Sequence, residues 1–253
     1  MTRCFVSAVM LALIGARVAA AEEDLAGQLK TLQKERVKVL AELVEIRAMQ
    51  YKVATHPCEF VAGAEADLAK AQLDATDNRE GRIAVLEEAA KRQIELLRTV
   101  EGKLKAGAVA DAAVYCARAI YNDTKVRLLR ERGPNADAVA QINAAQHERV
   151  EALTQLVKLA LDQYEKGTTE VDAVVSAETA LINAQVNAAD TSEAKILVLT
   201  NAAKKETDFL KITEAKCEAG DAGSAEIDRA RSLLLDAKIR LLRERTLQKA
   251  EVK

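Results

Sequence analysis

Apolar residues recur every three or four positions along most of the chain, which is the spacing of one face of an α-helix. The first such stripe falls between residues 23 and 52 and contains Leu25, Leu29, Leu32, Val39, Leu40, Leu43 and Ile46. It is narrow and closely bordered by polar residues, as in the seam of a coiled coil. No segment alternates apolar and polar residues between hairpin turns, as β-strands would. The pattern therefore predicts an all-α protein made of long helices.

Breaks in the pattern divide the first half of the chain into four predicted helices, at residues 23–52, 57–75, 79–105 and 111–132. Pro57 suits the first turn of a helix but not its interior. Asn78 is placed to cap the helix that follows it, and Gly107 stands where a helix C-terminus favours glycine. Because the connecting turns are short, consecutive helices should pack as antiparallel hairpins.

The second half of the chain repeats the first at a constant offset of 113 residues. When residues 35–132 are placed over residues 148–245 without a gap, 40 of the 98 positions are identical. Gly133-Pro134-Asn135 separates the two copies. An internal repeat of this kind defines the architecture before any other feature. We therefore predict a tandem duplication of a four-helix, antiparallel hairpin or coiled-coil unit that forms an elongated bundle.

The N-terminal segment, residues 1–21, has the pattern of a secretory signal peptide. A basic start at Arg3 precedes an apolar run at residues 4–14, and small residues at 19–21 provide a cleavage site. An uncleaved anchor is the alternative, and Gly15 and Arg17 speak against it. We predict a signal peptide at 1–21, a first repeat at 22–132, a linker with the start of the next helix at 133–147, a second repeat at 148–245 and a tail at 246–253. The protein should be exported to a periplasm or secreted, most plausibly in a bacterial envelope.

The composition narrows the function classes. Aromatic residues make up 3% of the chain, which is too few for a ligand-stacking cleft. Without residues 1–21 the chain has 35 basic and 39 acidic residues with interspersed signs, so no basic face for nucleic acid is expected. No later segment is apolar enough to predict an integral membrane helix.

Three cysteines follow the predicted signal peptide: Cys58, Cys116 and Cys217. None is shared by the two copies. In an oxidising compartment, an odd number leaves at least one thiol unpaired or able to form an intermolecular bond. A bridge between Cys58 and Cys116 would require the hairpin tips of the first copy to lie side by side. Incidental small residues are the alternative interpretation, and the sequence leaves the question open.

Residue types that carry catalysis form no recognisable constellation. The two histidines, His56 and His147, lack the spacing of a metal site, and no serine stands in a nucleophile-elbow motif. Carboxylates are interleaved with Lys and Arg on helix faces, as in solvated helices. The Leu-Leu-Arg-Glu-Arg that ends each copy is either a docking patch or a helix end charged against its dipole. We predict a non-enzymatic protein without a catalytic, cofactor or metal site.

Residues 164–168, Tyr-Glu-Lys-Gly-Thr, together with 171–174 and 177–185, resemble a segment of TolC-like outer-membrane efflux proteins. The resemblance covers about 20 residues per copy and extends only to the hairpin tips; in the first copy Ala54 replaces the glycine and Pro57 enters. The family also has alternating strands, which this chain lacks. The resemblance implies the tip of a periplasmic helical hairpin that contacts an adaptor protein, with Gly167 and Thr168 at the tip.

From these observations we expect an exported helical scaffold or protein-interaction module. A protein partner or a second copy should bind through helical seams or hairpin tips. The predicted contact residues are Tyr51, Thr55, Gly107, Tyr164, Gly167, Thr168 and Gly220. Two alternatives stay open. An amphipathic lipid-surface binder would need broad apolar faces with aromatic residues, and a ligand-binding helical bundle would need a pocket lined by carboxylates or histidines.

Overall fold

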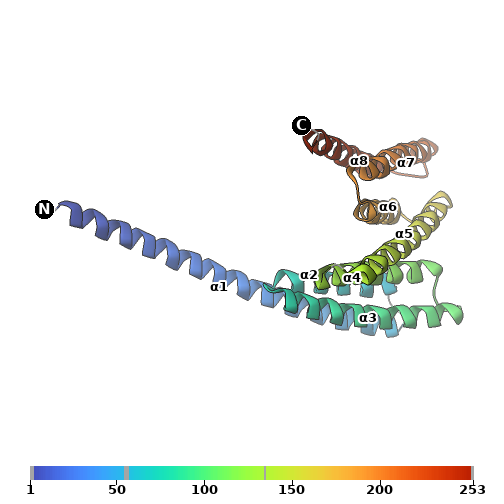
Figure 1. The fold of residues 1–253 in the computed structure, drawn as a ribbon. Helices are drawn as coiled ribbons and strands as arrows, with labels where there is room; N and C mark the ends of the chain where they lie inside the picture. Colours follow the sequence, from blue (N-terminus) through green and yellow to red (C-terminus); the bar gives the residue numbers. More distant parts are fainter. Residues whose placement is uncertain (1–2, 54–56, 134, 252–253) are drawn as a thin grey trace. The chain divides into compact units, whose positions relative to one another are not determined.

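We describe a computed structural model of the chain that covers residues 3–53, 57–133 and 135–251, with the side chains of residues 3–24, 26, 59 and 251 left aside. Every regular element in these ranges is an α-helix, which confirms the all-α prediction (Figure 1). The helices are α1 (Arg3–Lys52), α2 (Cys58–Asp74), α3 (Arg79–Lys105), α4 (Asp111–Arg132), α5 (Ala136–Glu165), α6 (Val171–Ala188), α7 (Ser192–Ala219) and α8 (Ser224–Glu251).

The ends of the first four helices lie close to the predicted ones. Helices α3 and α4 begin and end at the predicted residues, and α2 is one residue shorter at each end. Helix α1 ends at Lys52 as predicted but begins at Arg3, because residues 3–22 are rich in helix-forming residues and contain no proline. The signal peptide concerns processing and stays a prediction. Within the described residues, no helix combines the length and the apolar character that crossing a bilayer requires.

Residues next to the helix ends stop several helices and cap the start of others. Gly107, Gly167 and Gly220 follow α3, α5 and α7 with φ of 69°, 68° and 84°, a conformation that glycine adopts at little cost. The amide after each glycine returns to a carbonyl of the last helical turn, as in the bond from Asp221 to Lys216 at 2.9 Å. At the start of α7, the Thr191 hydroxyl accepts the Ala194 amide at 3.2 Å. These signals are local, so they could be read from the sequence.

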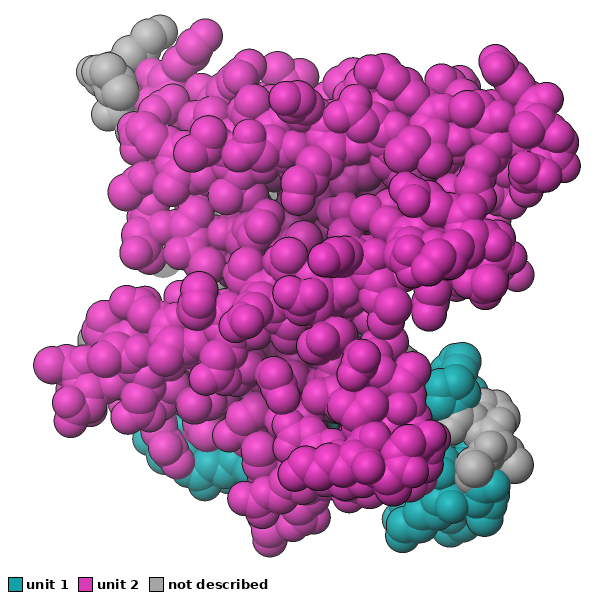
Figure 2. Space-filling model, turned by 90° about the vertical axis from the view of Figure 1, so that its right-hand side faces the viewer, with its two compact units in different colours: residues 1–89 teal, residues 90–253 magenta. Residues whose placement is uncertain are grey.

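The chain forms two compact units, residues 1–89 and residues 90–253 (Figure 2). The boundary falls inside α3. It differs from the repeat boundary at Gly133, which lies within the second unit. The predicted repeats are therefore divisions of the sequence, and helix packing in the second unit continues across the point where they meet.

In the first unit, α1 packs against α2. The Gln33 side-chain amide donates to the Asp74 carbonyl at 2.8 Å, and Arg36 reaches the Asp74 carboxylate at 3.1 Å. The buried face of α2 is rich in alanine and includes Ala64, Leu68 and Ala71. The apolar stripe of α1 differs from the expected coiled-coil seam, because most of its members are exposed: Leu25, Leu29, Leu32, Val39 and Ile46.

In the second unit, α4 and α5 form an antiparallel pair around the linker (Figure 1). The Asn135 side chain caps α5 by accepting the Ala138 amide at 2.6 Å. Further along the pair, the Arg149 guanidinium meets the Asp123 carboxylate at 2.7 Å. Burial lowers the pKa of Arg149, and the charge of Asp123 opposes that shift. The end of one sequence repeat thus packs directly on the start of the next.

Helices α5 and α6 pack together, α7 and α8 pack together, and α6 contacts both α7 and α8. Their main core is built mostly from alanine and branched aliphatic residues, including Val171 and Val174 on α6. The aromatic Phe209 on α7 also belongs to it. Ala177, Ala184 and Ala230 are buried in the seams, where small side chains let helix backbones approach closely. A smaller cluster joins α6, α7 and α8 around Ile182, Leu199, Ala202, Ala237 and Leu241.

Candidate functional site

The predicted contact residues divide into exposed turn residues and buried tyrosines. Gly107, Gly167, Thr168 and Gly220 are exposed in the turns after α3, α5 and α7, while Thr55 lies outside the described residues. Tyr51 and Tyr164 are buried, at 6% and 3% exposure. The two tyrosines therefore act mainly as packing residues between helices of the chain.

Tyr164 holds the two hairpins of the second copy together. Its ring packs edge-on against Phe209 of α7, with centroids 5.7 Å apart, and its hydroxyl donates to the Glu226 carboxylate of α8 at 3.0 Å. The Lys216 ammonium lies 4.3 Å from the ring centroid and donates to the Tyr164 carbonyl. Burial raises the pKa of Tyr164, and Thr213 and Glu226 act on it in opposite directions. These contacts bring the turns at 166–170 and 220–223 to the same end of helices α5–α8.

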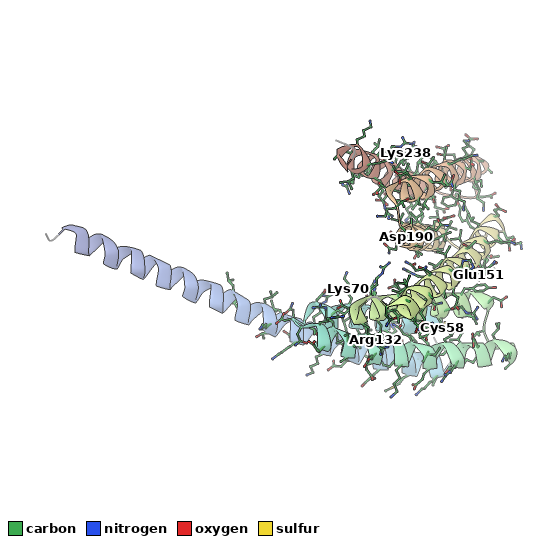
Figure 3. All side chains as sticks on the ribbon, viewed as in Figure 1. Cys58, Lys70, Arg132, Glu151, Asp190 and Lys238 are labelled. Atoms are coloured by element: carbon green, nitrogen blue, oxygen red, sulfur yellow. The ribbon has the colours of Figure 1, made fainter. Side chains whose placement is uncertain are left out.

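A groove of about 760 Å³ runs between α5, α6 and α7, on the side away from those turns. Apolar residues of α6, including Leu181 and Ile182, form part of its lining. Polar side chains also line it: Asn143, Gln146, His147, Glu178, Gln185, Asp190, Asn201, Lys204, Lys205 and Asp208. Figure 3 labels Asp190, which follows α6 at one end of this groove. His147 is exposed here.

Two carboxylates are buried beside the groove. Glu178 on α6 lines it and is 6% exposed. Glu206 on α7 is 1% exposed and lies close enough to Glu178 for their charges to interact. Burial, and then the charge of Glu178, raise the pKa of Glu206 to about 8, while Lys205 acts in the opposite direction. Burial also raises the pKa of Glu178, which Lys205 partly offsets. Neither oxygen of Glu206 has a hydrogen-bond partner among the described residues.

This arrangement attracts positive charge. Two neighbouring carboxylates in a low-dielectric site cannot both ionise easily, so Glu206 is largely protonated at neutral pH. A cation placed next to them would offset the repulsion and let both carry charge. Lys205 meets part of this need, and the groove leaves room for a second cationic group. Within the described residues, no cluster of three or more His, Cys, Asp or Glu side chains is placed to hold a metal ion.

Sequence reasoning missed this pair because it treated the carboxylates as solvated. The signal was the position of each residue relative to the apolar stripe. In the first copy, Glu65 and Gln93 align with Glu178 and Glu206, and all four are buried. In α3 the buried stripe contains Leu86, Ala89, Gln93, Leu97 and Val100, while Ile83, Ala90 and Ile94 beside it are half-buried. A polar residue on the buried stripe in both copies marks a retained polar position.

The three cysteines differ in burial. Cys58 is buried in the first unit, and Cys116 and Cys217 are half-buried in the second. Comparison with known proteins shows that the chain matches no family model, no curated protein and no solved structure.

Proposed function

We propose that this chain is an exported, non-enzymatic helical scaffold that binds a protein partner in the groove between α5, α6 and α7. In this proposal each sequence repeat is one four-helix hairpin unit, and export follows from the signal-peptide pattern of residues 1–21. The resemblance of residues 164–185 to the hairpin tips of TolC-like proteins supports a protein partner and a periplasmic location.

The groove carries the proposal. It offers apolar contacts from α6 next to the buried carboxylates Glu178 and Glu206. A peptide segment or helix that inserts an apolar side chain and places a Lys or Arg beside the carboxylates would satisfy both features. Recognition of a helix or extended segment in such a groove is a common mode of protein binding. The chemistry therefore points to a partner segment that is apolar with at least one basic residue.

The test is a pull-down from the native envelope fraction with three single variants. Asn201→Trp fills the groove from an exposed position on α7, and Thr200→Trp places the same side chain one residue away, outside the lining. Thr168→Trp places it at the exposed turn after α5. We expect a protein that wild type and the two other variants capture and that Asn201→Trp loses. Selective loss with Thr168→Trp would move the binding surface to the hairpin tip, and the absence of any saturable partner would overturn the proposal.

A ligand-binding bundle is the second candidate, favoured by the closeness of Glu178 and Glu206. A small organic diamine would neutralise both carboxylates. Titration calorimetry with such a diamine should show binding that Glu178→Gln weakens by about tenfold or more, as for loss of one partner of a desolvated charge pair. Equal binding by wild type and Glu178→Gln would remove this candidate.

A further inference from the structure

The packing of α4 on α5 provides an internal template for a second contact. Asp123 on α4 meets Arg149 on α5 at 2.7 Å, and the Asn122 side-chain amide donates to Glu148 at 3.2 Å. Ala119 on α4 belongs to the same core cluster as Ala152 on α5. One face of each helix is thereby buried along the pair.

The duplication places α8 over α4 and α1 over α5, at the same offset of 113 residues. The equivalents of the paired faces are exposed. On α4 the face residues Asn122, Val126 and Leu129 are 0–7% exposed, whereas their counterparts on α8 are 46–62% exposed. These counterparts are Leu235, Ile239 and Leu242. They are spaced four and three residues apart, so they form one stripe of the helix.

The same contrast holds for the other helix of the pair. On α5, Ala138, Ala145 and Ala152 are at most 6% exposed. Their counterparts on α1 are 57–63% exposed, and these are Leu25, Leu32 and Val39. They are spaced seven residues apart, again on one stripe.

The exposed stripes are more apolar than the buried faces that they match. Helix α1 has leucine or valine where α5 has alanine, and on α8 Leu235 stands where α4 has Asn122. A face selected for contact with water would show the opposite trend. Exposed apolar stripes of this kind mark surfaces that another protein covers.

The charged pair of the template is also retained. Asp123 and Arg149 correspond to Asp236 on α8 and Arg36 on α1, with both residue types unchanged. Asp236 has Arg240 nearby at 3.8 Å, as Asp123 has Arg127 at 2.9 Å. The two exposed faces are therefore complementary in charge and in apolar spacing.

We propose that a second copy of this chain binds with α8 of one molecule packed antiparallel on α1 of the next, as α4 packs on α5 within the chain. The contact joins two different surfaces, so a pair of molecules keeps one unoccupied surface of each kind. Such a heterologous contact forms open-ended assemblies unless its rotation closes a ring. These two surfaces lie outside the groove between α5, α6 and α7, so assembly is separate from the partner binding proposed in that groove.

The first test uses sedimentation velocity of the full chain over a wide concentration range. Wild type should form species larger than a dimer as its concentration rises. Leu242→Glu blocks the α8 face and Leu32→Glu blocks the α1 face, and each variant alone should remain monomeric. Because both positions are exposed, circular dichroism should show unchanged helix content.

An equimolar mixture of the two variants decides the geometry. Leu242→Glu retains a good α1 face and Leu32→Glu retains a good α8 face, so the mixture should form a dimer that grows no further. Self-association of Leu242→Glu alone would indicate an α1–α1 contact and overturn the proposal. A wild-type chain that is monomeric at all concentrations would also overturn the proposal. The stripe would then be covered in another way, by α8 of the same chain or by a lipid. Flotation of the full chain with anionic phospholipid vesicles identifies the lipid case.

A charge exchange tests the register. Asp236→Arg and Arg36→Asp should each weaken assembly by about tenfold, because like charges then face each other across the contact. The double variant should recover most of the loss. Arg36→Asp also removes an exposed pair with Asp74, which contributes little. Failure of the double variant to recover would show that the two helices do not meet in the register of α4 and α5. Asn201→Trp, which fills the groove, should leave assembly unchanged, so the two proposals fail separately.

Discussion

Helices α1 and α5 begin the two sequence copies, and they differ mainly in what covers them. Leu43 and Val44 of α1 reappear as Leu156 and Val157 of α5. Yet α5 is buried against α4 and α6, while the N-terminal half of the α1 stripe is exposed. An amphipathic stripe thus indicates which face of a helix can be buried, and the neighbouring helices decide whether it is.

A second contrast concerns the polar residue on the buried stripe of the third helix in each copy. In α3 this residue is Gln93, which stays neutral, and in α7 it is Glu206, which can ionise. Both are about 1% exposed. The two copies therefore place an amide and a carboxyl group in matched positions. Exchanging the two residue types measures what a buried charge does to stability.

The largest effect should come from a matched pair of core truncations. Leu153→Ala leaves a cavity on the buried face of α5 and should lower the free energy of unfolding by about 2–5 kcal/mol. Its counterpart Leu40 on α1 is only half-buried, so Leu40→Ala should cost clearly less. Urea unfolding followed by circular dichroism at low protein concentration measures both. Equal losses would mean that α1 is covered as fully as α5.

The second-largest effect should be a pH dependence of the free energy of unfolding that comes from Glu206. Its pKa is about 8 in the folded chain against the ordinary 4.5 of a glutamate, so the folded state holds a proton that the unfolded state has lost between these pH values. The free energy of unfolding should therefore fall as pH rises from about 5 to about 8, by about 2–3 kcal/mol. Glu206→Gln should remove that fall.

The reverse exchange provides the control. Gln93→Glu should introduce a similar loss of stability with rising pH in the first copy, because a buried carboxyl then has to ionise. Thermal unfolding between pH 5 and 8 compares the three proteins. A wild-type chain whose stability is constant over this range would show that Glu206 is ionised in the fold.

The smallest effect tests a feature that the copies share. Gly107 and Gly220 occupy matching turns with φ of 69° and 84°. Gly107→Ala and Gly220→Ala should each cost about 1 kcal/mol, because a Cβ disfavours this conformation. Gly223→Ala should be nearly neutral, since Ala110 already occupies its counterpart position. A different cost for the two turn glycines in chemical unfolding would show that the turns are not equivalent.

Much of the fold could be predicted because its signals are local. Gly107 ends α3, Thr191 caps α7 and Pro57 precedes α2, and each acts within one helical turn of its own position. The candidate site could not be predicted in this way. Glu178 and Glu206 look like any other helix-surface carboxylates until α5, α6 and α7 come together around them.

By itself, the sequence determined the all-helical class, most helix ends and the duplication, because helix propensity, capping and periodicity are properties of neighbouring residues. Only the tertiary structure decided which stripes are covered, where polar groups lose water and that α4 packs on α5 across the repeat boundary. Those outcomes depend on contacts between residues far apart in the chain. The same stripe can be core in α5 and surface in α1, since burial depends on a neighbour that the stripe does not encode.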